Sequence, residues 1–282
     1  MRTKWFVKKM ARKGLIAVTY LPLKVLRSLG RSRHPIRILT YHRFGSVPHD
    51  PFCVDPAVFD AQIRWLAEQQ LSISLDDLVG FLYEKRTLPD GAVLVTIDDG
   101  YRSTYDIALP ILEKYGVPAV SYVSAGIFDG SLDERGGHEP YMAAEELRQL
   151  PSRGMAIGSH GLSHRSMAKL PAADMCREAE ESRSILQRLT GTEILSFAYP
   201  FGTRKDYSAD SQSALQRAGY KVALTSQHEA VSRDSSPLSL PRIKIEGGES
   251  IWYFKAICAG GLDLWKHVDR FLFRLQRPLE TR

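Results

Sequence analysis

Short apolar runs alternate with amphipathic stretches through most of this chain. Runs typical of buried parallel strands lie at 36–41, 92–97, 119–123, 155–158, 194–198 and 221–225. Helical spacing of apolar residues is found at 105–115, 143–150, 172–189 and 208–218, and in a further stretch that begins at Pro56 after Asp55. This alternation predicts parallel β/α units, either as a barrel or as an open doubly wound sheet. In both arrangements, functional side chains gather at the carboxyl ends of the strands.

The overall composition adds little to this picture, whereas the distribution of charge along the chain is informative. The chain has 282 residues, 44% hydrophobic and 25% charged, which is ordinary for a globular protein with one large core. Residues 1–33 carry ten Lys or Arg and no acidic residue, which leaves 28 basic against 32 acidic residues in the remainder. Because the basic residues are not spread over a folded face, we expect no nucleic-acid partner.

The basic arm is also rich in apolar residues. Its apolar run, 15–21, ends at Pro22 and is shorter than the roughly 20 residues that span a bilayer. No small-residue cleavage site follows, so a secretory signal is not expected. Two interpretations stay open: residues 1–33 lie on an anionic membrane surface, or they form a solvated basic tail that packs on the domain. The expected location is cytoplasmic, peripheral on the inner face of the membrane in the first interpretation.

The remaining composition signals come from cysteine and from the C-terminus. Three widely spaced cysteines without a CxxC pair support neither a disulfide framework nor a thiolate zinc site, and they fit a reducing compartment. From Ile251 onward, aromatic residues stand between Lys and Arg. This segment is either a second surface for a membrane or partner, or a helix that covers the fold.

Two adjacent carboxylates end the apolar run at 92–97. Asp98 and Asp99 precede Gly100, and a turn at this glycine can bring both side chains into one cavity. Like charges this close repel each other unless a cation or a shared proton compensates them. The alternative is an ordinary strand-to-helix turn in which an aspartate caps the next helix.

A pair of histidines follows the run at 155–158. His160 and His164 are four residues apart, so a helical turn or tight loop can bring both imidazoles to one metal ion. No glutamate follows His160, which excludes the HExxH protease motif. With Asp99 they would leave open metal positions for water and substrate, as a catalytic zinc site requires. The alternative for each histidine is a hydrogen-bonded polar residue without a ligand role.

An aromatic turn, Tyr199-Pro200-Phe201-Gly202, ends a third run. It offers the backbone N–H groups of Phe201 and Gly202 and an apolar wall, or it serves packing alone. In this order, these motifs resemble the polysaccharide deacetylase family, the carbohydrate esterases with a NodB-homology domain. Other matching segments are Leu39-Thr40-Tyr41-His42, Ala108-Leu109-Pro110-Ile111-Leu112, Tyr115-Gly116-Val117-Pro118-Ala119 and Leu240-Pro241-Arg242-Ile243.

The resemblance covers about residues 36–245. It implies an α/β fold, a distorted and incomplete (β/α) barrel. We accordingly expect a basic arm over 1–35, a catalytic domain over 36–250 and an aromatic extension over 251–282.

The resemblance also implies residue roles. Asp98 would be the general base, and Asp99, His160 and His164 would bind zinc or a similar divalent ion. The backbone N–H of Phe201 would stabilise the oxyanion. Tyr199 and Pro200 belong to the same substrate-facing turn.

Two departures from the family pattern point to further residues. Ala198 stands where the family usually has an arginine that orients the catalytic aspartate, and Arg242 is the candidate replacement. The late Leu-x-His that usually supplies the general acid has no match. In the similar branch that deacetylates poly-N-acetylglucosamine, an early Tyr-His histidine takes this role, which points to His42.

The expected activity is metal-dependent removal of N-acetyl groups from an amino-sugar glycan, either a polymer or a lipid-linked precursor, in bacterial glycan biosynthesis. Two alternatives stay open. The same metal site would serve an O-acetyl ester, a formamide or a small cyclic amide, or the chain would be a glycan-binding protein without catalysis. The intact Asp-Asp and His-His pairs argue against the last alternative, whereas Ala198 argues for it.

Overall fold

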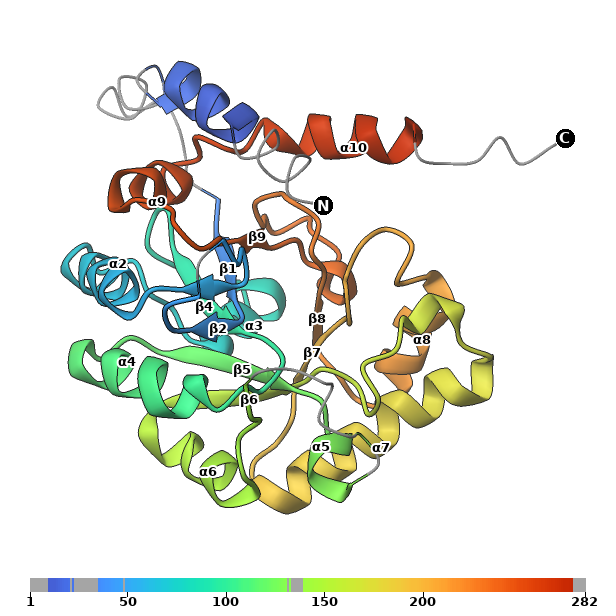
Figure 1. Ribbon diagram of the computed structural model, residues 1–282. Helices are drawn as coiled ribbons and strands as arrows, with labels where there is room; N and C mark the ends of the chain where they lie inside the picture. Colours follow the sequence, from blue (N-terminus) through green and yellow to red (C-terminus); the bar gives the residue numbers. More distant parts are fainter. Residues whose placement is uncertain are drawn as a thin grey trace, which may run out of the picture.

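A curled parallel sheet forms the centre of the molecule (Figure 1). The computed structural model describes residues 10–20, 22, 35–47, 49–130, 132 and 139–275. Within them the sheet has seven strands in the order β8-β7-β6-β5-β4-β1-β9. The strands are β1 (Arg37–Tyr41), β4 (Val93–Ile97), β5 (Ala119–Val123), β6 (Met155–Ser159), β7 (Ser196–Ala198), β8 (Val222–Leu224) and β9 (Ile243–Lys244). The prediction of an incomplete (β/α) barrel is confirmed.

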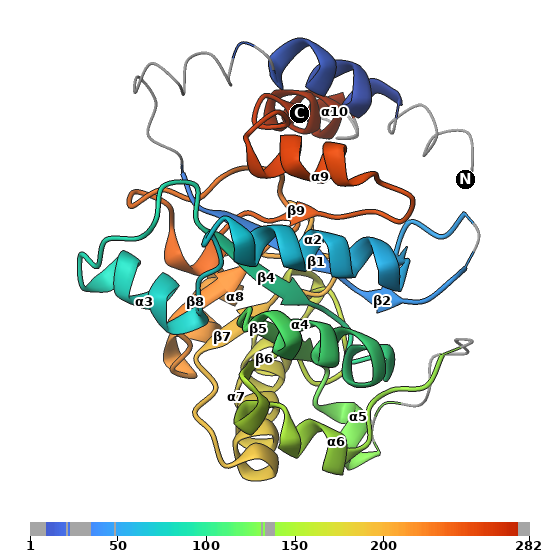
Figure 2. The same cartoon turned by 90° about the vertical axis from the view of Figure 1, so that its left-hand side faces the viewer.

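Helices surround the sheet (Figures 1 and 2). They are α2 (Pro56–Glu68), α3 (Leu75–Tyr83), α4 (Leu109–Tyr115), α5 (Gly126–Asp129), α6 (Ala144–Gln149), α7 (Ala172–Thr190), α8 (Ala209–Arg217), α9 (Ile251–Cys258) and α10 (Trp265–Leu275). Helix α2 begins at the predicted residue because the Asp55 side chain accepts hydrogen bonds from the N–H groups of Ala57 and Val58. A separate parallel pair, β2 (Arg43–Phe44) and β3 (Cys53–Val54), is too short for any sequence periodicity to predict.

The helix predicted over 105–115 is divided in two. Its first part, Thr104–Ala108, is a π-helical turn, and α4 follows directly. The backbone N–H of Leu109 donates to the carbonyl of Thr104, five residues earlier. Pro110 has no N–H to continue the α-helical pattern, and the wider turn accommodates its ring.

The segment before β9 bridges the open side of the barrel. Leu240 pairs with Leu224 of β8, and the N–H of Thr225 donates to the Leu240 carbonyl at 2.8 Å. Three residues later, Ile243 pairs with Leu39 of β1 at the other edge of the sheet. Arg242 lies between these two pairings and is buried. The near-closure of the sheet therefore carries Arg242 into the interior.

The strands themselves supply the core. All five residues of β1, β4 and β5 are buried. Alternate residues join different clusters, so Leu39 and Val95 pack in one and Ile38 and Leu94 in the other. Because both faces of the strands are covered, polar side chains of these strands are largely restricted to their ends.

Part of the basic arm packs on the domain. Residues 10–20 are helical, and Arg12 and Ile16 are buried. Arg12 forms ion pairs with Glu246 at 3.1 Å and Glu249 at 3.7 Å. The packed interpretation thus holds for this stretch, whereas Trp5 and Phe6 fall outside the described residues. No helix in the described ranges is long and apolar enough to cross a membrane.

Candidate active site

The two carboxylates at the end of β4 enter one cavity. The Asp98 N–H donates to the Tyr41 carbonyl and so extends the β1–β4 pairing by one residue. Asp99 and Gly100 then adopt positive φ angles of 75° and 76°. A Cβ at Gly100 would lie 3.0 Å from the Val123 side chain, so the turn needs glycine for both space and conformation.

The cavity has a volume of about 530 Å³ and lies at the carboxyl ends of the strands. Its lining residues are Thr40, His42, Arg43, Phe52, Asp98, Asp99, Tyr101, His160, His164, Tyr199, Phe201, Thr203, Ser226, Arg242 and Lys244. Every site residue that the sequence predicts, except Pro200, is among them. Pro200 is buried within the turn.

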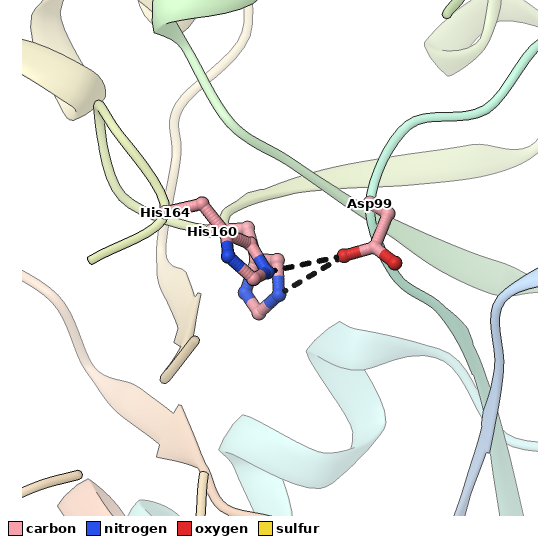
Figure 3. Close-up of side chains that lie close together, drawn as sticks. All are labelled: Asp99, His160 and His164. Atoms are coloured by element: carbon pink, nitrogen blue, oxygen red, sulfur yellow. Dashed lines mark ion pairs between the residues drawn. The ribbon is translucent and has the colours of Figure 1, made fainter. Parts of the chain in front are cut away.

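Asp99, His160 and His164 converge from two strand ends (Figure 3). The Asp99 Oδ1 lies 3.5 Å from His160 Nε2 and 3.3 Å from His164 Nε2. All three potential ligand atoms are within 4.8 Å of one another. His160 Nδ1 lies 2.6 Å from the Ala198 carbonyl, which can only accept. The Nδ1 therefore carries a hydrogen, and the Nε2 atom is the one that faces Asp99.

This arrangement fits a divalent cation. Two imidazole nitrogens and one carboxylate form a donor set of catalytic zinc sites, and a hydrogen bond at the second ring nitrogen is the usual way to orient such a histidine. Burial alone would raise the pKa of Asp99, but hydrogen bonds with His160 and His164 outweigh it and hold that pKa well below its usual range. Asp99 is therefore ionised, as a metal ligand must be.

A buried glutamate that sequence reasoning missed holds the loop between the two histidines. Glu178, on α7, accepts hydrogen bonds from the N–H groups of Leu162 at 2.7 Å and Ser163 at 3.1 Å. Its other oxygen accepts from the Ser163 hydroxyl. Gly161 passes so close that a Cβ there would lie 2.9 Å from the carboxylate. The only sequence signal was an acidic residue at a core-facing position of the predicted helix over 172–189.

Arg242 binds Asp98 with both ends of its guanidinium group. Its Nη1 and Nη2 each donate to one Asp98 oxygen at 2.7 Å, and its Nε donates to the Thr225 carbonyl at 3.0 Å. Burial raises the pKa of Asp98, but the charges of Arg242 and His160 outweigh this and lower it below the usual range. Asp98 is therefore ionised and fixed in orientation. Ala198, at the end of β7, makes no side-chain contribution to this pair.

His42 follows β1 and lines the same cavity. Its ring packs edge-on against Phe52 at 4.9 Å, and its Nδ1 has no hydrogen-bond partner in the described part of the chain. Burial, aided by the charges of Lys244 and Arg242, lowers the pKa of His42 to about 4 despite the nearby aspartates. This value lies below the ordinary histidine pKa of about 6.5, so His42 is neutral at pH 7.

The aromatic turn after β7 forms the opposite wall. Phe201 is exposed, has a positive φ of 61° and packs its ring 5.0 Å from that of His164. The Gly202 N–H donates to the Pro200 carbonyl at 2.7 Å and is thus already used. Among the described residues no acceptor is found for the Phe201 N–H. Of the two backbone donors that the sequence offers, only that of Phe201 remains for a ligand.

A family model described as polysaccharide deacetylase matches residues 85–223. These residues are a polysaccharide deacetylase domain. The matched range includes Asp98, Asp99, both histidines of the metal cluster and Phe201. His42 and Arg242 lie outside it, although the fold brings both into the same cavity.

Two named relatives extend the match. The Staphylococcus aureus poly-β-1,6-N-acetyl-D-glucosamine N-deacetylase is 27% identical over 206 residues, which cover 69% of this chain and 68% of the relative. A Bacillus subtilis protein, YxkH, whose name also refers to polysaccharide deacetylases, is 25% identical over 214 residues, 76% of this chain and 72% of the relative. The predictions of this family and of a deacetylase enzyme are confirmed.

Solved structures show the same fold. The Streptococcus pyogenes deacetylase PplD, in complex with acetate, superposes with a TM-score of 0.69 at 22% identity, and the match covers 88% of this chain and all of PplD. IcaB from Ammonifex degensii gives a TM-score of 0.67 at 20% identity, over 81% of this chain and 97% of that structure. At these identities the likeness concerns the fold alone.

Backbone strain in this deacetylase concentrates at the cavity. Among described residues other than glycine, six have positive φ angles, and three of these are Asp99, His164 and Phe201. Such conformations cost of order 1–3 kcal/mol each and persist where the surrounding structure enforces them. Here Gly100, the Glu178 contacts and the Pro200–Gly202 hydrogen bond provide that enforcement.

Further cavity residues of the deacetylase were not evident from sequence. The Lys244 ammonium group lies 3.4 Å from the centre of the Phe52 ring. The Arg43 guanidinium group lies 5.4 Å from the centre of the Tyr101 ring. Phe52 belongs to the turn before β3, and Lys244 ends β9. Neither position is part of a recognisable motif. Phe52 and Lys244 reach the cavity only because the fold brings β1, β3 and β9 to the same end of the barrel.

Proposed function

We propose that this deacetylase removes N-acetyl groups from an amino-sugar glycan, either a polymer or a lipid-linked precursor, with the help of a divalent metal ion. One observation carries the proposal: the Asp99, His160 and His164 cluster shares a cavity with an ionised Asp98 that Arg242 holds in place. The name of the Staphylococcus aureus relative, an N-deacetylase of poly-β-1,6-N-acetyl-D-glucosamine, supports the substrate class.

Asp99, His160 and His164 are the proposed metal ligands, and zinc is the expected ion because of this nitrogen-rich donor set. A divalent ion bound there would polarise the acyl carbonyl and make a water molecule more acidic. The chain's own part is to orient the ligands. The His160–Ala198 hydrogen bond and the Glu178 contacts to the histidine loop perform this task.

Asp98 is the proposed general base. It is ionised and takes the proton of the water that attacks the acyl carbon. Arg242 keeps both carboxylate oxygens oriented. It takes the role of the arginine that the family usually has at the position of Ala198. Because the pKa of Asp98 is lowered, the protonated form gives up its proton readily.

His42 is the proposed proton donor to the leaving nitrogen. It begins the reaction neutral, so it must gain a proton within the site before it can donate one. Asp98 and His42 lie in each other's electrostatic field, and the unpartnered Nδ1 of His42 can accept. One proton then suffices: it leaves the water for Asp98, passes to His42 and ends on the departing amine as the C–N bond breaks.

The turn after β7 is the proposed acyl-binding wall. The Phe201 N–H is directed at the developing oxyanion, a type of donor worth roughly 3–4 kcal/mol in the transition state. Tyr199 lines the cavity, and its hydroxyl donates to the Leu238 carbonyl, which leaves its ring as a rigid surface for substrate. Pro200 restricts the backbone of the turn, and its carbonyl accepts the Gly202 N–H.

Acetate release from a panel of N-acetylated glycans tests this function. The panel contains poly-β-1,6-N-acetylglucosamine and chitin oligosaccharides, each assayed with chelator and again after zinc is restored. We expect acetate release that chelation abolishes and zinc recovers. His160→Ala and His164→Ala should lose both bound metal and activity, whereas His267→Ala, an exposed histidine on α10, should lose neither.

Other outcomes would redirect the proposal. Release of formate from N-formyl substrates, or of acetate only from O-acetyl esters, would keep the metal site and change the substrate. Full metal occupancy in either histidine variant would refute the ligand assignment. Glycan binding with no release from any substrate would favour the non-catalytic alternative.

A further inference from the structure

Both ends of the chain build one layer at one end of the molecule. The helical residues 10–20 lie over α9 and next to α10 (Figures 1 and 2). The Thr19 hydroxyl donates to the Gly261 carbonyl at 2.7 Å, and the Tyr20 ring packs edge-on against Trp252 at 5.5 Å. We call residues 10–20, α9 and α10 the terminal platform.

The inward faces of the terminal platform are tied to the domain. Arg12 and Ile16 are buried from the helical arm, and Trp265 is buried from α10. The Trp265 indole donates to Asp269, one turn later, at 2.9 Å. These contacts fix which face of each helix points away from the fold.

The outward faces are apolar. Val18 is 73% exposed and Phe271 is 61% exposed, although both are large hydrophobic residues. On the α10 side, Leu264, Val268 and Phe271 recur at intervals of four and three residues, so they lie on one face of the helix. The exposed large apolar residues of the terminal platform are Met10, Val18, Ile251, Trp252, Val268 and Phe271, and the exposed Leu264 directly precedes α10. A concentration of this kind marks an interaction surface.

Charge identifies the partner. Residues 1–33 carry ten basic and no acidic residues, and within them Arg12 is already paired with Glu246 and Glu249. The other nine basic residues of 1–33 therefore add positive charge to the segment that contains the helical residues 10–20. A second copy of the chain would bring the same charges and repel, whereas the headgroups of an anionic bilayer complement them.

We propose that the terminal platform docks on an anionic membrane surface. Its apolar faces, Val18 on the arm and Val268 and Phe271 on α10, enter the boundary between headgroups and acyl chains. The basic residues of the arm meet the headgroups. Such peripheral binding combines apolar burial with electrostatic attraction and needs no spanning helix. This inference goes beyond the proposed catalytic function and does not depend on it.

Vesicle co-sedimentation of the full chain tests the proposal. Vesicles of phosphatidylcholine mixed with phosphatidylglycerol should retain the protein, vesicles of phosphatidylcholine alone should retain much less, and high salt should release it. The variant Val268→Gln/Phe271→Gln removes apolar surface without changing charge. It should bind the mixed vesicles about tenfold or more weakly, because two partly exposed apolar side chains lose their burial in lipid.

The matched control makes the same kind of change elsewhere. Val47 and Tyr83 are 52% and 53% exposed and lie outside the terminal platform, so Val47→Gln/Tyr83→Gln should bind like the parent. Circular dichroism and thermal unfolding verify that each variant is folded. Equal vesicle binding by the parent and the platform variant would overturn the proposal. So would absence of binding to anionic vesicles, or a parent dimer that the platform variant abolishes.

Discussion

Arg242 and Asp98 form a buried bidentate pair in which both hydrogen bonds measure 2.7 Å. The two residues are 144 positions apart, and they meet because the segment before β9 bridges the open side of the barrel. We propose that this pair takes the role of the arginine that the family usually has at the position of Ala198. A guanidinium group from a different part of the barrel reaches the same carboxylate.

Arg242→Lys should lower kcat by about 10²-fold or more, because an ammonium group cannot hold both oxygens of Asp98 in place. It should also shift the acidic limb of the kcat profile. Arg242 lowers the pKa of Asp98, so weakening the pair raises that pKa and activity disappears at a higher pH than in the parent.

The pH dependence of kcat between acid and neutral pH measures this effect. Arg177→Lys, at an exposed ion pair on α7, is the control and should leave the profile unchanged. An Arg242→Lys enzyme whose acidic limb coincides with that of the parent would show that Arg242 does not act through Asp98.

His42→Ala should reduce amide hydrolysis by roughly 10²–10⁴-fold, since the leaving nitrogen needs a proton. An activated ester with a good leaving group should suffer far less, because such a group departs unprotonated. Metal content should stay that of the parent, since His42 is not one of the three clustered ligands.

The ratio of amide to ester rates, measured with metal analysis, separates the roles of His42. Equal losses on both substrates would identify His42 as a structural residue, and loss of metal would identify it as a ligand. His49→Ala, a change at an exposed loop histidine, is the control and should preserve both rates.

Glu178→Ala should weaken metal binding by about 10–100-fold, the usual effect of removing a residue that positions ligands. The substitution leaves the N–H groups of Leu162 and Ser163 without their acceptor and frees the loop that carries His160 and His164. Glu178→Gln keeps an acceptor oxygen and should recover part of the affinity.

The metal dissociation constant and the urea unfolding free energy are measured together. Glu181→Gln, an exposed position on the same helix, is the control. A Glu178→Ala protein that unfolds more easily yet binds metal as tightly as the parent would reduce Glu178 to a purely structural residue.

Arg12→Ala should destabilise the fold by about 3–5 kcal/mol, because it removes the buried guanidinium group that pairs with the buried carboxylates of Glu246 and Glu249. It should also raise KM for the proposed glycan substrate. Arg12 donates to the carbonyl of Lys244 at 3.3 Å, and the Lys244 side chain lines the cavity.

Urea unfolding and steady-state kinetics test both effects. Lys13→Ala changes the neighbouring exposed residue and should alter neither stability nor KM. An Arg12→Ala protein with parental stability would show that Arg12 does not contribute to the free energy of unfolding. A lower stability with an unchanged KM would show that Arg12 does not influence substrate binding in the cavity.

Much of this architecture was predictable because its signals are local. The apolar runs that become β1, β4, β5 and β6 contain their own strand propensity, and the predicted helix over 172–189 differs from α7 by a single residue. A polar motif that follows a buried strand must lie at the strand's carboxyl end. That rule is sufficient to predict that Asp99, His160 and His164 share one site.

Only the tertiary structure decided how these residues are held and charged. Glu178 is an ordinary helical residue until α7 packs against the histidine loop, and Arg12 looks like one of ten arm cations until it meets Glu246. The pKa of His42 falls to about 4 because the folded chain removes water from the ring, and no spacing of residues encodes that loss. Hydrophobic periodicity predicts elements one at a time, whereas burial and pairing depend on which elements meet across the incomplete barrel.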